Sequence, residues 1–189
     1  MIDFTFTEEQ VMLREMVKRF AENEVKPFAR QIDKEQNVDL VKSIFKKGAT
    51  LGLAGIPFPV AYGGSEMGEI GYCILLEELS HACAATTITY GAHMGLAGMS
   101  IFIGGTEAQK QKYLTALATG EKIGAYALTE PGAGSDAANL QLTARPDGDH
   151  FILNGTKLWI TNGDIADIVI VYTLTDPAQK ARGGITAFI

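Results

Sequence analysis

The sequence predicts an α+β protein, with a helical domain over residues 1–122 followed by a β domain over residues 123–189. Apolar residues recur at spacings of three and four up to about residue 117, as they do along one face of a helix. Beyond Lys122 this period is lost, and short apolar runs alternate with Gly, Pro, Asn and Asp, as in strands joined by turns. Helices that precede strands, rather than alternate with them, are typical of the α+β class.

The N-terminal helix should begin after Thr7, because Thr7 and Gln10 form a T-x-x-Q capping box. Its apolar positions continue to about Val25. Pro27 should interrupt or restart it, because proline has no backbone N–H to donate. A second helical pattern covers roughly Val38–Lys47.

Two later segments, Ile70–His81 and Ala85–Ile103, are apolar nearly all round, as expected of helices buried among other helices. The second approaches the length of a membrane span, but His93 near its centre and its glycines favour a buried core helix. A second capping box, Thr106 with Gln109, predicts a helix that ends near residue 117.

The region after residue 122 predicts short strands joined by tight turns. The expected strands are Ile123–Leu128, Leu140–Ala144, Phe151–Leu153, Lys157–Thr161 and Asp167–Thr173. Pro146–Asp149 should form one turn, and Asn154-Gly155 should join two hairpin strands. Gly183–Ile189 breaks off within a strand pattern, so we expect a cut chain with an incomplete sheet.

Composition and charge exclude several classes of protein. The 189 residues are 47% hydrophobic and 20% charged with a net charge of −6, which is typical of a globular, acidic protein. The sequence has no basic stripe that nucleic acid would need, and its 2 cysteines are too few for a disulfide-built secreted scaffold. The acidic N-terminus lacks the order of a signal peptide, so a cytoplasmic location is expected.

The histidines and cysteines show no spacing typical of metal ligands. His81, His93 and His150 form no ligand pattern with one another or with Cys73 and Cys83, so we expect core cysteines and no metal. A G-x-S-x-G nucleophile elbow is absent from the sequence, which argues against a hydrolase triad.

The densest cluster of turn residues is TEPGAGSD at Thr129–Asp136, directly after an expected strand. Small residues with hydroxyls and free backbone N–H groups form the kind of concavity that receives a phosphate. Gly132, Gly134 and Ala137 also satisfy the permissive dinucleotide fingerprint, but a strand pattern rather than a helix follows, which disfavours a nicotinamide site. A tight glycine loop without a ligand is the alternative, and Glu130 more simply shapes this turn than acts as a base.

The only tryptophan, Trp159, stands at the end of an expected strand in WITNG, Trp159–Gly163. Most single tryptophans belong to a core or to a satisfied surface position. The functional alternative is a flat wall for a ring-shaped ligand, with the hydroxyl of Thr161 available to polar atoms of that ring.

Taken together, YALTEPGAGSD at Tyr126–Asp136 and WITNG at Trp159–Gly163 closely resemble the two flavin signatures of the acyl-CoA dehydrogenase family, in the family's order. Four further segments add to the resemblance: FTFTEEQ at Phe4–Gln10, GLAGIPFPVAYGG at Gly52–Gly64, ILLEELS at Ile74–Ser80 and GTEAQKQKYL at Gly105–Leu114. The resemblance covers essentially the whole chain. It implies an N-terminal helical domain and part of an antiparallel, barrel-like middle β domain, without the family's C-terminal helical bundle.

The resemblance implies FAD as the cofactor and places its contacts on two segments. The implied contacts are Tyr126, Leu128, Thr129, Gly134, Ser135, Trp159, Ile160 and Thr161. Trp159 would pack against the isoalloxazine, and the hydroxyls of Thr129 and Thr161 would hydrogen-bond its polar edge. Ser135 would lie near the flavin pyrophosphate and the bound CoA ester, and the apolar helix around Ile88–Phe102 would line the acyl tunnel.

The family reaction is the α,β-dehydrogenation of an acyl-CoA thioester in fatty acid β-oxidation, in which a glutamate takes the α-proton and the β-hydride passes to the flavin. That glutamate belongs to the family's C-terminal bundle, so we expect no catalytic residue among Met1–Ile189 and no turnover by this chain alone. The resemblance further implies an acyl-CoA substrate, an electron-transfer flavoprotein as acceptor, and a homotetramer.

Two alternatives stay open from the sequence. A flavin oxidase or monooxygenase of the same fold keeps similar loops but passes electrons to oxygen. A non-catalytic flavin- or CoA-binding module, or a partner subunit, would use the same two segments without the base.

Overall fold

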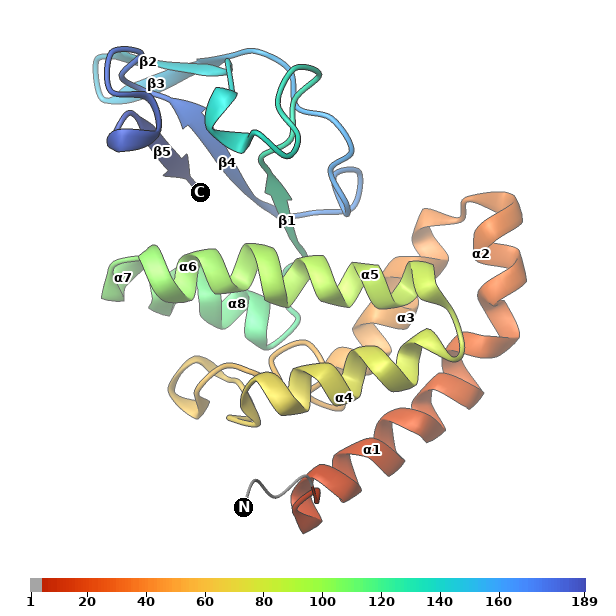
Figure 1. Ribbon diagram of the computed structural model, residues 1–189. Helices are drawn as coiled ribbons and strands as arrows, with labels where there is room; N and C mark the ends of the chain where they lie inside the picture. The colour runs from red at the N-terminus through yellow and green to blue at the C-terminus, as the bar shows by residue number, and fades with distance from the viewer. Residues whose placement is uncertain (1–4) are drawn as a thin grey trace.

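The computed structural model describes residues 5–189 and shows a small sheet stacked on one side of a helical layer (Figure 1). Met1–Phe4 lie outside the described residues. They include the first residue of FTFTEEQ and the start of the N-terminal stretch that was predicted not to be a signal peptide. The α-helices are α1 (Glu8–Phe20), α2 (Ala29–Glu35), α3 (Val38–Thr50), α4 (Gly68–Ser80), α5 (Ala84–Gly91), α6 (Met99–Gly104), α7 (Glu107–Gln109) and α8 (Thr115–Ala118). The strands are β1 (Gly124–Ala127), β2 (Thr143–Asp147), β3 (His150–Asn154), β4 (Ile168–Leu174) and β5 (Ile185–Phe188). Helices before strands confirm the expected fold class.

Both predicted capping boxes are present. The Thr7 hydroxyl oxygen accepts from the Gln10 N–H at 3.2 Å, and the Gln10 side-chain oxygen accepts from the Thr7 N–H at 3.0 Å. Thr106 and Gln109 repeat the two bonds at 3.3 and 2.8 Å. Each box satisfies N–H groups that a helix start otherwise leaves unpaired, which explains where α1 and α7 begin.

Several helices continue into one another through short stretches of other helix types. α1 passes through a π-helical turn, Ala21–Val25, and a 3₁₀ turn, Lys26–Phe28, into α2, so Pro27 marks a change of helix type within one run. The π-helical segment Ala92–Gly98 joins α5 to α6, and the resulting run over residues 84–104 is close to the expected Ala85–Ile103. Within residues 5–189, no helix is both long and apolar enough to cross a membrane.

The sheet is mixed, which differs from the antiparallel sheet that the resemblance implies. β4 and β5 are antiparallel and β2 and β3 form an antiparallel hairpin, but β1 runs parallel to β4. The Ile123 carbonyl accepts from the Asp167 and Ile168 N–H groups at 2.8 and 3.1 Å. Because these bonds join the first ends of β1 and β4, the two strands leave the helical layer in the same direction.

The β2–β3 hairpin turns at Gly148-Asp149, within the turn predicted at Pro146–Asp149, whereas Asn154-Gly155 joins no pair of hairpin strands. Asp147 pairs with His150, so β2 both begins and ends three positions later than the predicted Leu140–Ala144. Gly148 takes the φ of +64° that suits a two-residue hairpin turn. Lys157–Thr161, expected as a hairpin strand, forms no strand. This prediction was wrong because the stretch bonds to residues 128 and 129 instead of to β3.

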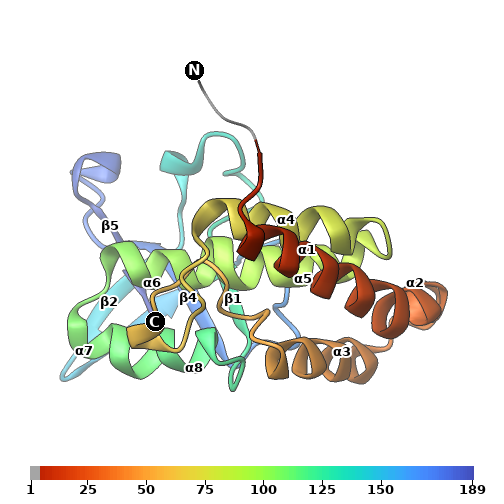
Figure 2. The ribbon, with the colours of Figure 1, turned by 90° about the horizontal axis from the view of Figure 1, so that it is seen from below.

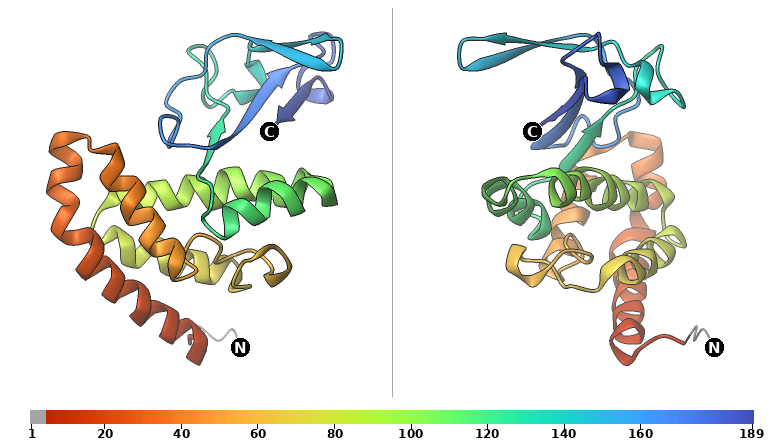
Figure 3. Two further views of the ribbon diagram at one scale, coloured as in Figure 1. Left: turned by 180° about the vertical axis from the view of Figure 1, so that it is seen from behind. Right: turned by 60° about the vertical axis from the view of Figure 1, so that its left-hand side comes forward.

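The layers follow the order sheet, α5–α6 run, α4, α1 (Figures 1 and 3), and the view from below shows α1 lying across α4 (Figure 2). The largest fully buried side chains include Tyr90, Phe45, Phe58 and Ile44, all from the helical region. The core also takes in Ile123 and Ile170, so it reaches the base of the sheet. The α5–α6 run, residues 84–104, therefore lies directly beneath the base of β1, and we call it the α5–α6 floor.

Candidate functional site

The first predicted segment runs from β1 into an exposed loop. Tyr126 is half-buried, and its ring lies 5.0 Å from that of Tyr172 on β4. Burial raises the pKa of Tyr126 to about 12, with a further contribution from Tyr172, so the hydroxyl stays protonated at neutral pH. Gly134 and Ser135 are exposed, and a Cβ built on Gly134 would meet nothing within 4 Å. A ligand can therefore approach this backbone closely.

Glu130 braces the loop from inside. Its side chain is 5% exposed, and its carboxylate accepts from Lys157 Nζ at 2.7 Å, the Leu142 N–H at 3.0 Å and the Gln141 N–H at 2.6 Å. Burial raises the pKa of this carboxyl, but the Lys157 ammonium and the two N–H groups outweigh burial and hold the pKa below its usual value. A carboxylate bonded in this way is a poor base, which agrees with the turn-shaping role expected for Glu130.

The two predicted segments lie side by side because residues just before Trp159 bond to the first segment. Lys157 Nζ donates to the Leu128 carbonyl at 2.9 Å, and the Leu158 N–H donates to the Thr129 carbonyl at 2.9 Å. Leu128 and Thr129 are both half-buried. The structure thus brings them next to the segment that begins at Trp159, although each bonded pair is separated by 29 positions along the chain.

Trp159 is 88% exposed, the highest value among the exposed large hydrophobic residues of the described chain. Its φ of +58° is rare for a residue with a side chain, and Asn162 in the following turn is at +65°. Such conformations cluster at ligand sites, where the surroundings hold them in place. An exposed indole on a constrained turn lies outside the core formed by the described residues, and it fits a flat ring ligand. Ile160, next in the chain, is half-buried.

Three hydroxyls of the two segments have bonding capacity to spare. Within the described part of the chain, the hydroxyls of Thr129, Ser135 and Thr161 make no hydrogen bond. Thr161 lines a hollow of about 220 Å³ with Ile32 and Thr89 of the helical layer, whereas Ser135 is exposed in the glycine-rich loop. An exposed flat side chain, free hydroxyls and an open glycine backbone fit a flavin with a phosphate tail.

The α5–α6 run lies beneath the sheet (Figure 1), and the resemblance assigns it to the acyl tunnel. Ile88 and Leu96 on this run are 55% and 45% exposed. A hollow of about 130 Å³ lies between α6 and the sheet, lined in part by Ser100, Ile170 and Tyr172. The run therefore offers apolar surface on which an acyl chain could lie.

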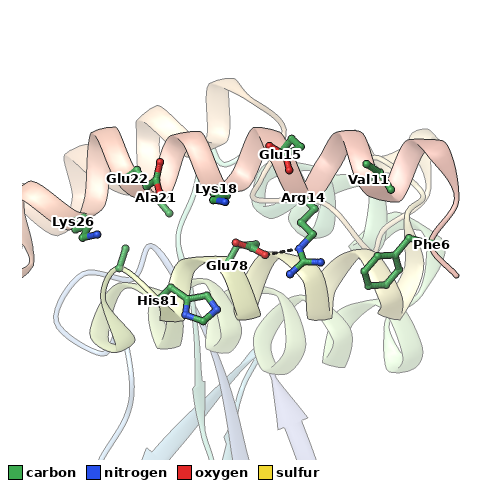
Figure 4. Close-up of a pocket in the computed structure, with 11 residues that line it drawn as sticks. Phe6, Val11, Arg14, Glu15, Lys18, Ala21, Glu22, Lys26, Glu78 and His81 are labelled. Carbon is green, nitrogen blue, oxygen red and sulfur yellow. Dashed lines mark hydrogen bonds and ion pairs between the residues drawn. The ribbon is translucent and has the colours of Figure 1, made fainter. Parts of the chain in front are cut away.

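A larger cavity, of about 450 Å³, lies between α1 and α4 (Figure 4). Arg14 Nε donates to Glu78 Oε1 at 2.6 Å, and Lys18 and His81 also line the cavity. None of the predicted site residues lines it. In the layer order it lies beyond the α5–α6 run as seen from the sheet, so the candidate site is the pair of loop segments.

The described residues contain no group of three or more His, Cys, Asp and Glu that could hold a metal ion. Cys83 is half-buried, but Cys73 is exposed, so the expectation of a core position was wrong for Cys73. Cys73 lies on α4 three positions after Ile70, which is 55% exposed, so both belong to a side of this helix that the described residues leave open.

The sequence did not predict the role of two buried polar residues beside the site. His93 is 0% exposed and Asn162 is 7% exposed, and each bonds to Gly124, the first residue of β1. The Asn-Gly pair in WITNG was a signal for a turn with positive φ. The sequence held no comparable signal for His93, because its partners are 24 and 31 positions away.

Known proteins resemble the chain along its whole length. The acyl-CoA dehydrogenase N-terminal domain matches residues 7–121, and the acyl-CoA dehydrogenase middle domain matches residues 125–189. A short-chain specific acyl-CoA dehydrogenase of Clostridium acetobutylicum is 47% identical over 188 residues, which are 100% of this chain and 49% of that protein. A mitochondrial isovaleryl-CoA dehydrogenase of Pongo abelii is 45% identical over 97% of this chain and 44% of its own length.

Solved structures agree with the sequence matches. A chain from a structure of the electron transferring flavoprotein of Acidaminococcus fermentans superposes with a TM-score of 0.94 and 42% identity, over 99% of this chain and 48% of its own. An acyl-CoA dehydrogenase from Bacillus anthracis, complexed with FAD, superposes with a TM-score of 0.90 and 38% identity, over 100% of this chain and 32% of its own. The chain spans about half the length of the curated relatives it matches. Since both its helical and its sheet regions match in sequence and in fold, the chain belongs to the acyl-CoA dehydrogenase family.

Proposed function

We propose that this chain contributes the flavin wall and part of the acyl-CoA site to a FAD-dependent acyl-CoA dehydrogenase, which forms an α,β double bond in an acyl thioester. The observation that carries the proposal is Trp159, an indole 88% exposed on a turn with φ +58°. The bond from Leu158 to Thr129 holds this turn against the glycine-rich loop. Relatives named acyl-CoA dehydrogenase and a structural neighbour complexed with FAD support the proposal.

The proposed flavin contacts are Tyr126, Leu128, Thr129, Gly134, Ser135, Trp159, Ile160 and Thr161. Trp159 would cover one face of the isoalloxazine and keep water from it. The hydroxyls of Thr129 and Thr161 would bond to its polar edge, and Ser135 would bond to a pyrophosphate oxygen and lie near the CoA ester. FAD bound there supplies the acceptor for the β-hydride. No residue of this chain is assigned as the base for the α-proton.

We also propose the division into a helical domain over residues 1–122 and a β domain over residues 123–189. An electron-transfer flavoprotein as acceptor is part of the proposal, supported by the neighbour from Acidaminococcus fermentans. A homotetramer and a cytoplasmic location complete it. Light scattering of the whole protein tests the assembly, and a fluorescent fusion tests the location.

Titration of the chain with FAD tests its share of the site. We expect saturable binding that Thr129→Val weakens and Thr129→Ser preserves, because serine keeps the hydroxyl. Absence of saturable binding would contradict the proposal.

The type of reaction is tested in the whole protein by anaerobic mixing of the FAD-loaded form with acyl-CoA thioesters of several lengths. A dehydrogenase loses its visible flavin absorbance as the enoyl-CoA forms. An unchanged spectrum would indicate a non-catalytic module, and substrate-dependent oxygen consumption in air would indicate an oxidase or monooxygenase.

A further inference from the structure

The backbone of Gly124, where β1 leaves the helical layer, is held at both of its polar atoms by buried side chains. The Gly124 N–H donates to His93 Nδ1 at 3.0 Å. Asn162 Nδ2 donates to the Gly124 carbonyl at 3.1 Å and to the Thr89 carbonyl at 3.0 Å. One side chain comes from the helical floor and the other from the second flavin segment, so three parts of the chain meet at one glycine.

The partners of His93 fix its protonation. His93 Nε2 lies 3.1 Å from the Leu117 carbonyl, which can only accept, so Nε2 carries the hydrogen. Nδ1 then has a free lone pair and accepts from Gly124. Burial lowers the pKa of His93 to about 4, which keeps the ring neutral in this tautomer at neutral pH. His93 lies on the π-helical segment Ala92–Gly98, and π-helical segments are frequent at functional sites.

Gly124 must be a glycine for β1 to approach the helix this closely. A Cβ on Gly124 would lie 2.8 Å from the Ala97 Cβ and 3.2 Å from Leu117 Cδ2. The close approach brings the Gly124 N–H within reach of the buried imidazole.

Asn162 connects Gly124 to the turn that carries Trp159, the proposed flavin wall. It lies three positions after Trp159 at φ +65°, and its carbonyl accepts from the Ile165 and Ala166 N–H groups at 3.0 and 2.8 Å. Asparagine tolerates this conformation better than most residues. Its amide therefore ties the turn that presents Trp159 to both α5 and β1.

We propose that His93 and Asn162 are positioning residues that clamp Gly124 and thereby set where the two flavin segments stand relative to the α5–α6 floor. The consequence for FAD rests on the proposed function, whereas the clamp itself does not need FAD. Both can be measured on the full chain.

Two substitutions at His93 separate its two bonds. His93→Asn keeps an acceptor at the position of Nδ1, and His93→Gln keeps a donor near the position of Nε2, so only the glutamine variant loses the bond to Gly124. Both variants remove the ring and share the resulting loss of packing. We expect the Gly124 amide to exchange with solvent at least about tenfold faster in His93→Gln than in His93→Asn.

The anisotropy of Trp159 fluorescence reports the clamp at the second segment, because Trp159 is the only tryptophan. It should fall in His93→Gln and stay near the wild-type value in His93→Asn. Affinity for FAD should weaken by at least about tenfold in the glutamine variant relative to the asparagine variant.

Asn162→Gly tests the other half of the clamp. Glycine accepts φ +65° without strain, so this variant removes the amide and keeps the backbone conformation. We expect lower Trp159 anisotropy and weaker FAD binding. Wild-type anisotropy and affinity in this variant would overturn the role of Asn162.

Equal amide exchange and equal anisotropy in the two His93 variants would overturn the role of His93, whether or not FAD binds. If the wild-type chain fails to bind FAD while exchange and anisotropy follow the expected pattern, the proposed function fails and the clamp stands.

Discussion

The helical layer and the two loop segments differ in how far they bury their aromatic side chains. Tyr90 in the helical layer is 0% exposed, its ring lies 4.9 Å from that of Phe45, and its hydroxyl donates to the Phe45 carbonyl at 3.2 Å. Trp159 in the loops is 88% exposed on a turn that is itself firmly bonded. In the helical layer, the chain itself supplies the packing and hydrogen-bond partners of the aromatic side chain. In the loops, the aromatic side chain is exposed to solvent. This difference is the one expected if the helical layer supplies stability and, as proposed, the loops supply recognition.

Removing the Phe45 ring should have the largest effect on stability. A small effect would contradict the contrast between the helical layer and the loops. Phe45 is 1% exposed and also packs edge-on against His93 at 4.8 Å. We expect Phe45→Ala to lower the free energy of unfolding by about 3–5 kcal/mol, because it leaves a cavity in the core. Urea denaturation measures this loss. A loss as small as that of an exposed residue would mean that the helical core does not stabilise the fold.

Lys157→Met tests whether the loops are braced as firmly as the core. Lys157 and Glu130 are 8% and 5% exposed, so the substitution leaves a buried carboxylate without its ammonium. We expect the free energy of unfolding to fall by about 3–5 kcal/mol. The matched control, Lys157→Met with Glu130→Gln, removes both charges and should recover much of the loss. A single variant as stable as the wild type would show that the brace is dispensable.

Acid should weaken the junction between the two regions through His93. Burial holds the pKa of His93 at about 4 in the folded chain, against 6.5 unperturbed, with a small further lowering from Lys46. Between these values the unfolded chain binds the proton and the folded chain does not, so stability is full above pH 6.5 and declines as the pH falls to about 4. The whole loss is about 3 kcal/mol.

The pH dependence of the urea midpoint, compared between the wild type and His93→Asn, checks this expectation. The variant has no imidazole at this position and should lack the decline between pH 6.5 and 4. Identical profiles would show that another group is responsible.

The sequence predicted those parts of the fold that depend on nearby residues. Thr7 and Thr106 begin helices through bonds that span three positions, so their capping boxes were readable. Lys157 was wrongly assigned to a strand because its bonds reach positions 27 and 29 residues away, and no local pattern records them.

The candidate site likewise contains features that short motifs predicted and features that depend on residues far apart in the sequence. The glycine-rich loop and Trp159 were recognised from short motifs, and the structure places the two segments side by side. The buried bonds of His93 and Asn162 depend on how the helices, β1 and the second segment pack, so only the folded chain reveals them.

Trp159→Ala should have the smallest effect on stability and a clear effect on the ligand. Alanine has the same backbone strain at φ +58°, so the free energy of unfolding should change by no more than about 0.5 kcal/mol. Loss of the stacking contact, worth about 0.5–1.5 kcal/mol, should weaken FAD binding about threefold to tenfold. Trp159→Phe keeps a flat ring and is the control. A large loss of stability in Trp159→Ala would place the indole in the core after all.

The fluorescence of Trp159 during a titration of the chain with FAD tests the central claim most directly, because no other tryptophan contributes. If Trp159 is the flavin wall, its emission is quenched to saturation, with the same midpoint as the change in flavin absorbance. FAD that binds without altering the emission of Trp159 would contradict the account.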